Sequence, residues 1–153
     1  MREYTKIQAW ALVDDLAVVI YGATRTFPKE ELYGLTSQLR RAASSVPANI
    51  VEGSARERKK DYLHFLYIAR GSLAETRYFI HLARRLSYLP EAEAVALTAQ
   101  SRKTFTCMHG LIQAVEKKDG KLARIVAAIT SLLVLGLVRV VMGNTLLRSP
   151  LSV

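Results

Sequence analysis

Apolar residues recur at three- and four-residue steps through four stretches of this sequence, which is the spacing of one face of a helix. The breaks between the stretches fall at Phe27-Pro28, at Gly53 and at Leu89-Pro90. Alternating patterns typical of strands do not occur over a useful length. We therefore predict an all-α chain, an antiparallel up-down-up-down four-helix bundle with an apolar C-terminal extension.

The limits of the predicted helices follow from residues that start or stop a helix. Pro28 is typical of a first helical turn, and Gly53 is typical of a left-handed C-terminal cap. Ser54 and Glu57 have the spacing of a capping box at the start of the third helix. Gly120 follows a basic turn and indicates the end of the fourth helix. The predicted helices cover about residues 5–26, 28–52, 54–86 and 91–117.

One apolar side of each helix is expected to face the core. Asp14 falls inside this side in the first helix, so it either reaches water at the edge or pairs with Arg40. The expected core positions are Ile7, Trp10, Ala17, Tyr21 and Thr24, with Val13, Val18 and Ile20 beside them; Leu32, Leu35, Leu39, Ala42, Val46 and Ile50; Tyr62, Leu66, Ala69, Leu73, Thr76, Ile80 and Ala83; and Ala94, Thr98, Ser101, Phe105, Met108, Ile112 and Val115.

The third helix is apolar on nearly every side, and the second has an outer face of small residues around Arg41. A bundle of this length buries one side of each helix, and soluble monomers rarely keep a large apolar patch exposed. We therefore predict a homo-oligomer in which Arg41 bridges to an acid of a neighbouring subunit. The predicted interface residues are Arg41, Ser44, Ala48, Tyr67, Gly71, Ala74 and Tyr78.

The segment after the bundle has a different character. Residues 125–138 carry no charge, but these fourteen residues span only about 21 Å as a helix, short of a bilayer core of roughly 30 Å. Three interpretations stay open: a fifth helix packed on the bundle or between subunits, a membrane contact through residues 122–147, or a poorly ordered appendage. The predicted organisation is a bundle over residues 1–117 and an extension over residues 118–153.

Charge and cysteine content narrow the range of partners and compartments. The chain has 22 Lys and Arg against 13 Asp and Glu, a net charge of +9, which is compatible with a polyanionic partner. The single cysteine, Cys107, and an N-terminus unlike a signal peptide indicate a cytoplasmic protein. His64, His81 and His109 lie on different faces or helices, so we expect no metal, no cofactor and no enzymatic activity.

A long ordered string carries a family resemblance. FPKEELYGLTSQLRRAASSVPANIVEGSAR, followed by YLHFLYIARGSLAETRYFIHLARRL, resembles the bacterial four-helix-bundle proteins encoded by intervening sequences of large-subunit ribosomal RNA genes. The accessory variability protein of diversity-generating retroelements is similar. The resemblance covers about residues 5–117. It implies a homopentameric barrel with basic surfaces that bind nucleic acid, and in the retroelement relatives a reverse transcriptase as partner.

Basic clusters mark the predicted nucleic-acid contacts. Several copies on one assembly would form a ring of charge that binds phosphates through counterion release. We therefore predict an oligomeric scaffold that binds RNA or DNA without sequence-specific readout. The alternative is a protein–protein adaptor or structural oligomer with no nucleic-acid role, with the tail as a membrane contact. The predicted nucleic-acid-binding residues are Arg56, Arg58, Lys59, Lys60, Arg84 and Arg85.

Overall fold

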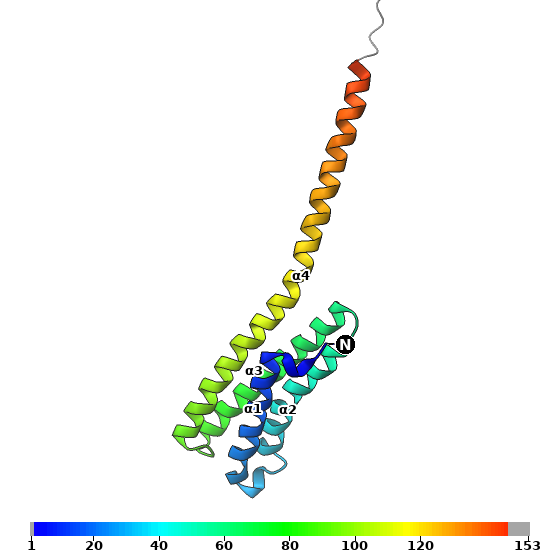
Figure 1. The fold of residues 1–153 in the computed structure, drawn as a ribbon. Coiled ribbons are helices and arrows are strands. Elements are labelled where there is room, and N and C mark those ends of the chain that lie inside the picture. The colour runs from blue at the N-terminus through cyan, green and yellow to red at the C-terminus, as the bar shows by residue number, and fades with distance from the viewer. Residues whose placement is uncertain (1, 147–153) are drawn as a thin grey trace, which may run out of the picture. The chain divides into compact units, whose positions relative to one another are not determined.

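A computed structural model describes the backbone of residues 2–146 and the side chains of residues 2–117 and 128–135. Throughout this range the secondary structure is helical, without strands, which confirms the all-α prediction. The α-helices are α1 (Gln8–Ala23), α2 (Leu35–Ser54), α3 (Lys59–Arg85) and α4 (Glu91–Leu146) (Figure 1). Short 3-10 turns lie at Tyr4–Lys6 (η1), Thr24–Thr26 (η2) and Lys29–Glu31 (η3).

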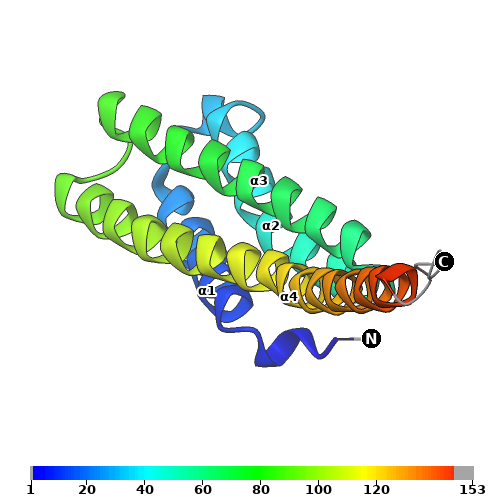
Figure 2. The same cartoon turned by 90° about the horizontal axis from the view of Figure 1, so that it is seen from above.

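The chain forms two compact units, Met1–Val115 and Glu116–Val153. The first unit contains α1, α2, α3 and the first part of α4, which lie side by side (Figure 2). Its apolar core draws side chains from all four helices. This unit therefore contains the apolar core, and its surface carries the candidate functional residues.

The closest packing in this unit is between α2 and α3, which run antiparallel. Near their connection, a Cβ atom added to Gly53 would lie 2.8 Å from the Cβ atom of Phe65. Farther along, the hydroxyl groups of Ser45 and Ser72 lie 3.0 Å apart. Small side chains on α2 let the two helix backbones approach, as ridges-into-grooves packing requires.

Gly53 and Ser54 do not have the roles predicted for them. Gly53 lies inside α2, and no described glycine has a positive φ, so the predicted left-handed cap is wrong. Ser54 is the buried last residue of α2, and its hydroxyl donates to the Val51 carbonyl at 2.7 Å, so the predicted capping box is wrong too. The α3 helix begins only at Lys59, after extended Arg58. Gly53 is needed for close packing rather than for backbone conformation.

The start of α2 also differs from the prediction. Pro28 precedes the 3-10 turn η3, and α2 begins seven residues later at Leu35. The Glu31 carboxylate accepts a hydrogen bond from the Leu35 amide at 2.8 Å and so satisfies one of the free N–H groups of the first turn. A carboxylate also interacts favourably with the positive end of the helix dipole.

The core of α3 agrees with the predicted core at every position, whereas in α1 and α4 the prediction is right for only part of the buried side. In α1, Tyr21 is 46% exposed and Val18 is 68% exposed, while Leu16 is buried. The Tyr21 ring lies 5.0 Å from the Arg40 guanidinium, and Arg40 donates to the Thr24 hydroxyl at 2.7 Å. The predicted Asp14–Arg40 pair therefore does not form, and Asp14 lies half-buried at the edge of the core. The buried residues of α1 are Ala9, Val13, Leu16, Ala17 and Ile20.

The buried side of α4 includes Ala94, Ser101, Met108 and Ile112 as predicted, and differs from the prediction at its edges. Leu97 and Thr104 are buried, although neither was predicted to be in the core. Thr98 and Phe105, which were predicted core residues, are only half-buried at the edge facing α3. Leu97 and Thr98, about 100° apart around the helix, lie at opposite edges of the side that contains Ala94 and Ser101, so the packing partners decide which edge is buried.

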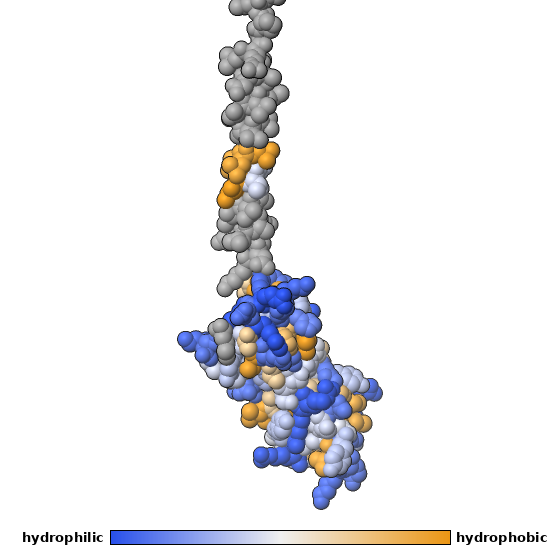
Figure 3. Space-filling view, turned by 90° about the vertical axis from the view of Figure 1, so that its right-hand side faces the viewer, coloured by the Kyte–Doolittle hydropathy of each residue, from blue (hydrophilic) through white to orange (hydrophobic). Residues whose placement is uncertain are grey.

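The predicted end of α4 at Gly120 is wrong, because the helix continues to Leu146. One glycine costs only about 1 kcal/mol in a helix interior, and the next proline is Pro150. The extension therefore continues the fourth helix and is not a separate fifth one; residues 147–153 lie outside the described part. Ile129 and Leu132 to Leu135 are exposed and form the apolar stretch seen in Figure 3. No helix of the described residues is long and apolar enough to cross a membrane.

The Gly53→Ala substitution should destabilise the protein by about 1–3 kcal/mol, because the new methyl group would overlap Phe65 and lie 3.1 Å from Cδ2 of Tyr62. Gly110→Ala is the matched control, since a Cβ atom at Gly110 meets nothing within 4 Å. The control should be neutral or stabilising by up to about 1 kcal/mol. Chemical denaturation measures both changes, and equal effects of the two substitutions would contradict the close-packing role of Gly53.

Deletion of Gly120–Val153 should leave a folded bundle, because the apolar core of the first unit is complete by Val115. Far-UV circular dichroism during heating should show one cooperative transition for the truncated chain, as for the full-length control. Loss of that transition would mean that the deleted segment contributes to the core.

Candidate nucleic-acid interface

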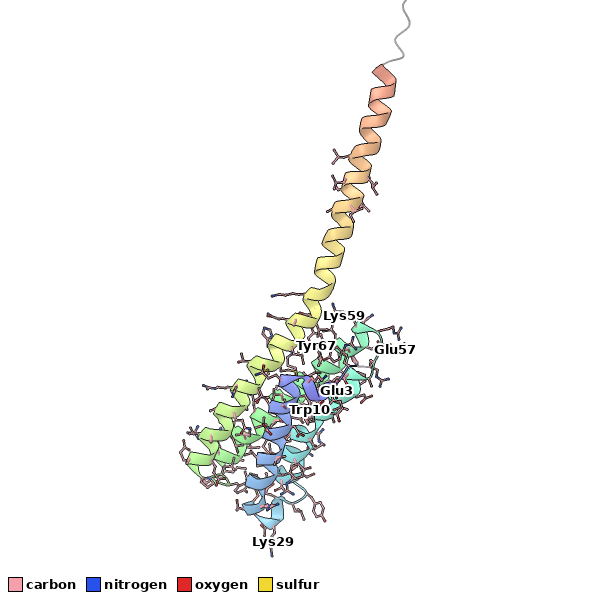
Figure 4. All side chains as sticks on the ribbon, in the orientation of Figure 1. Glu3, Trp10, Lys29, Glu57, Lys59 and Tyr67 are labelled. Carbon is pink, nitrogen blue, oxygen red and sulfur yellow. The ribbon has the colours of Figure 1, made fainter. Side chains whose placement is uncertain are left out.

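The predicted basic cluster of Arg56, Arg58, Lys59 and Lys60 lies at the connection between α2 and α3; we call it the connection cluster. Lys59 and Glu57 of this region lie at the opposite end of the bundle from Lys29 (Figure 4). Arg56 pairs with Glu52 at 2.5 Å, and its guanidinium lies 4.8 Å from the Phe65 ring. Arg58 pairs with Asp61 at 2.9 Å.

The N-terminal segment is fastened to the same connection. The Arg2 side chain donates to the carbonyl of Arg56 at 2.8 Å, and its backbone N–H donates to the carbonyl of Ser54 at 3.1 Å. Its guanidinium lies 4.4 Å from the Tyr62 ring. Burial raises the pKa of the Tyr62 phenol, although the Arg2 charge lowers it. The backbone of the connection cluster therefore has a structural role.

Local carboxylates offset most of the charge of the connection cluster. With Arg2, which binds to the same connection, the region has five cations and three acids, Glu52, Glu57 and Asp61, so that 5 − 3 leaves two net positive charges. Exposed ion pairs stabilise the fold by only about 0–1 kcal/mol, but they lower the positive potential that a phosphate meets. The run of basic letters in the sequence thus overstates the charge of this surface.

The other two predicted nucleic-acid residues lie at the far end of α3. Arg84 and Arg85 are separated from Lys59 by about 39 Å at the standard helical rise, so the structure does not bring the six predicted residues together. Two nitrogens of the Arg84 guanidinium donate to the Glu91 carboxylate, Nε at 2.9 Å and Nη2 at 2.6 Å. This ion pair joins the end of α3 to the start of α4.

A second basic surface, of which the sequence analysis predicted only Arg84, lies between α3 and α4. A groove of about 460 Å³ separates the exposed edges of these antiparallel helices, and we call it the α3–α4 groove. The Arg77 guanidinium of α3 lies 5.3 Å from the centre of the Phe105 ring, so this contact joins α3 to α4. The groove is lined by Ala74, Arg77, Tyr78, His81 and Arg84 of α3 and by Thr98, Ser101, Arg102 and Phe105 of α4.

A smaller share of the positive charge is offset in the α3–α4 groove, with one acid for three cations, than at the connection, with three acids for five cations. Arg77, Arg84 and Arg102 face one neighbouring carboxylate, Glu91, so that 3 − 1 leaves two net positive charges. The side chains of Arg102 and His81 are exposed and form no ion pair or hydrogen bond with any residue described. The i, i+4, i+7 spacing of residues 77, 81 and 84 was the available sequence signal.

The predicted interface residues of α3 form an exposed stripe. Tyr67, Gly71, Ala74 and Tyr78 are all exposed and follow one side of the helix. Tyr67 is 39% exposed, with the Arg70 guanidinium 4.8 Å from the centre of its ring, and Tyr78 is 57% exposed. We call these four residues the α3 stripe.

The predicted interface residues of α2 lie on the helix that packs against α3. Arg41 forms its ion pair within the chain, with Glu75 of α3 at 2.8 Å, rather than leaving its charge for a neighbouring subunit. Ser44 is half-buried and donates to the Arg41 carbonyl at 3.2 Å, and Ala48 is exposed. Of the three, Ala48 alone has the exposed apolar character expected at an interface.

Metal-binding geometry is absent from the described residues, where no three His, Cys, Asp or Glu side chains gather. Cys107 is a half-buried free thiol on α4. His109 faces Gln113 on the same helix, with their side-chain nitrogens 3.0 Å apart. Among the side chains that can be placed, the functional candidates are therefore the basic surfaces and the exposed stripe.

The fold and these surfaces define a small, basic, all-helical bundle protein. Residues 5–110 match the model of the 23S rRNA-intervening sequence protein family, and the chain belongs to this family. This confirms the resemblance found in the sequence, whereas the similarity to the retroelement accessory protein stays a prediction.

A solved structure shares the fold. It is a protein of unknown function from the S23 ribosomal protein family of Bacteroides thetaiotaomicron VPI-5482, and it superposes with a TM-score of 0.61 at 21% sequence identity. The match covers 68% of this chain and 97% of that one. No curated protein matches the sequence.

Proposed function

We propose that this protein is a non-enzymatic, homo-oligomeric scaffold that binds RNA or DNA through basic surfaces without sequence-specific readout. The observation that carries the proposal is the excess of positive charge on the folded unit, above all in the α3–α4 groove, where three guanidinium groups face one carboxylate. Contacts of this kind bind phosphates and release counterions, and they do not distinguish one base sequence from another.

Assembly is the second part of the proposal. Tyr67 and Gly71 of the α3 stripe, together with Ala48, leave apolar and small side chains exposed on two helices that pack against each other. Covering them with another copy would remove this surface from water, and a contact between two different patches closes into a ring when the rotation permits it. The number five comes from the family resemblance alone. A ring would repeat each basic surface once per subunit.

The competing function is a protein–protein adaptor whose positive charge has no nucleic-acid role. The exposed apolar side chains of residues 129 and 132–135 favour some contact of the extension with another molecule, a protein or a membrane surface. The two functions differ in one property, since only the first requires affinity for a polyanion that weakens with salt.

The affinity for random-sequence RNA and DNA should fall steeply with salt. In a plot of the logarithm of the association constant against the logarithm of the salt concentration, we expect a negative slope of several units. Fluorescence anisotropy with labelled oligonucleotides between about 50 and 200 mM salt measures it. No detectable binding to duplex or single strands at the lowest salt would exclude the nucleic-acid role and favour the adaptor.

Ala48→Arg should break the assembly and leave the fold intact, because it places a charge on an exposed residue of α2 outside the core. Ala11→Arg, on an exposed position of α1, is the matched control and should leave the assembly unchanged. Light scattering gives the mass and circular dichroism gives the helix content. A wild-type mass near 17.1 kDa that does not depend on concentration would rule out the oligomer.

A further inference from the structure

The α3–α4 groove differs from the other grooves of the bundle in its side chains. The two grooves between α1 and α4 are lined mainly by small and apolar residues. The groove near η2 and η3 contains Arg25, Lys29 and Arg40, but Arg40 binds Thr24 and Phe27 is buried. The α3–α4 groove has three guanidinium groups and an exposed aromatic ring at one place.

The aromatic ring of this groove is accessible and held in position. Tyr78 is 57% exposed, and its ring packs against the half-buried Phe79 ring, with their centroids 5.5 Å apart. The Phe105 ring on the opposite helix already carries the Arg77 guanidinium over it. A planar ligand therefore has one open aromatic surface, that of Tyr78, beside positively charged groups.

Cationic groups next to an open aromatic ring match single strands better than duplexes. Proteins that bind single strands combine a positive groove that follows the phosphates with aromatic side chains on which bases stack. In a duplex the bases are already stacked on each other, so the Tyr78 ring would have no base to hold. The hydroxyl groups of Thr98 and Ser101 donate to carbonyls of their own helix, so these two donors are not available to base edges.

We propose that the α3–α4 groove binds single-stranded nucleic acid, with Arg77 and Arg102 contacting phosphates and the Tyr78 ring stacking on a base. This inference rests on the proposed nucleic-acid function and assigns it a site and a strand form. It also moves the main contact away from the connection cluster, whose cations are mostly offset by neighbouring carboxylates.

The groove and the connection cluster are separated by comparing Arg102→Glu with Lys60→Glu. Both residues are exposed, and both changes replace a positive charge with a negative one and lower the net charge by two, so the general electrostatic effect is matched. With a labelled ten-nucleotide single-stranded RNA at low salt, Arg102→Glu should weaken binding at least tenfold, and Lys60→Glu less than threefold. Circular dichroism melts verify that both variants are folded.

Stacking is tested on the unmodified protein by photo-crosslinking to a single strand that contains 4-thiouridine. The crosslinked peptide should contain Tyr78, and a duplex of the same length should bind more weakly than the single strand. Competition with a ten-residue polyglutamate should be weak if the ring contributes, since this peptide offers charge without a stacking group.

Each alternative outcome overturns a defined part of the proposal. Binding of single strands that Lys60→Glu abolishes and Arg102→Glu leaves unchanged would place the site at the connection cluster and keep the proposed function. Equal competition by polyglutamate, equal binding of duplex, or a crosslink confined to residues 56–60 would exclude stacking in the groove. Failure of the wild-type protein to bind any nucleic acid would refute the proposed function together with the groove.

Discussion

The close approach of α2 and α3 is the constraint on which the rest of the bundle depends. Gly53 leaves room for Phe65 and Tyr62 because any side chain at this position would overlap them. With the approach fixed, Tyr62 becomes one of the largest fully buried side chains. Arg2 then lies over the ring of this same residue. The contact therefore sets which side of α3 is buried and where the N-terminal segment attaches.

The sequence predicted the helical class and the buried side of α3 because that helix has a strict 4-3 spacing of apolar residues. It was only partly right for α1 and α4, where apolar side chains such as Val18 and Val95 occur on more than one side. Periodicity cannot then select the buried side, and the packing partner decides it. It also failed for Gly53, because a glycine at a helix end has the same sequence context whether it supplies a positive φ or space for a neighbour.

The candidate site was predicted less well than the fold for a related reason. A run of basic letters, such as residues 56–60, is visible in a sequence, but the acids that neutralise it come from the preceding turn and the following turn. The positive charge of the α3–α4 groove, by contrast, is not visible as a run of basic residues in the sequence. Arg77 and Arg102 are far apart in the sequence and become neighbours only when α3 and α4 pack antiparallel. Net charge at a surface is therefore a property of the fold.

The outer sides of α3 serve two proposed contacts at once, and this follows from the geometry of one long helix. One side is occupied by the core and another by α2, which leaves the α3 stripe and the groove edge beside it. Ala74 and Tyr78 lie where the stripe meets the groove, and the proposed base contact needs the Tyr78 ring uncovered. The subunit contact is therefore assigned to the part of the stripe that contains Tyr67 and Gly71. Ala48 lies on α2 outside the groove, and Arg102 lies on α4 outside the stripe. These two residues therefore report on assembly and on nucleic-acid binding separately, because each contributes to one surface alone.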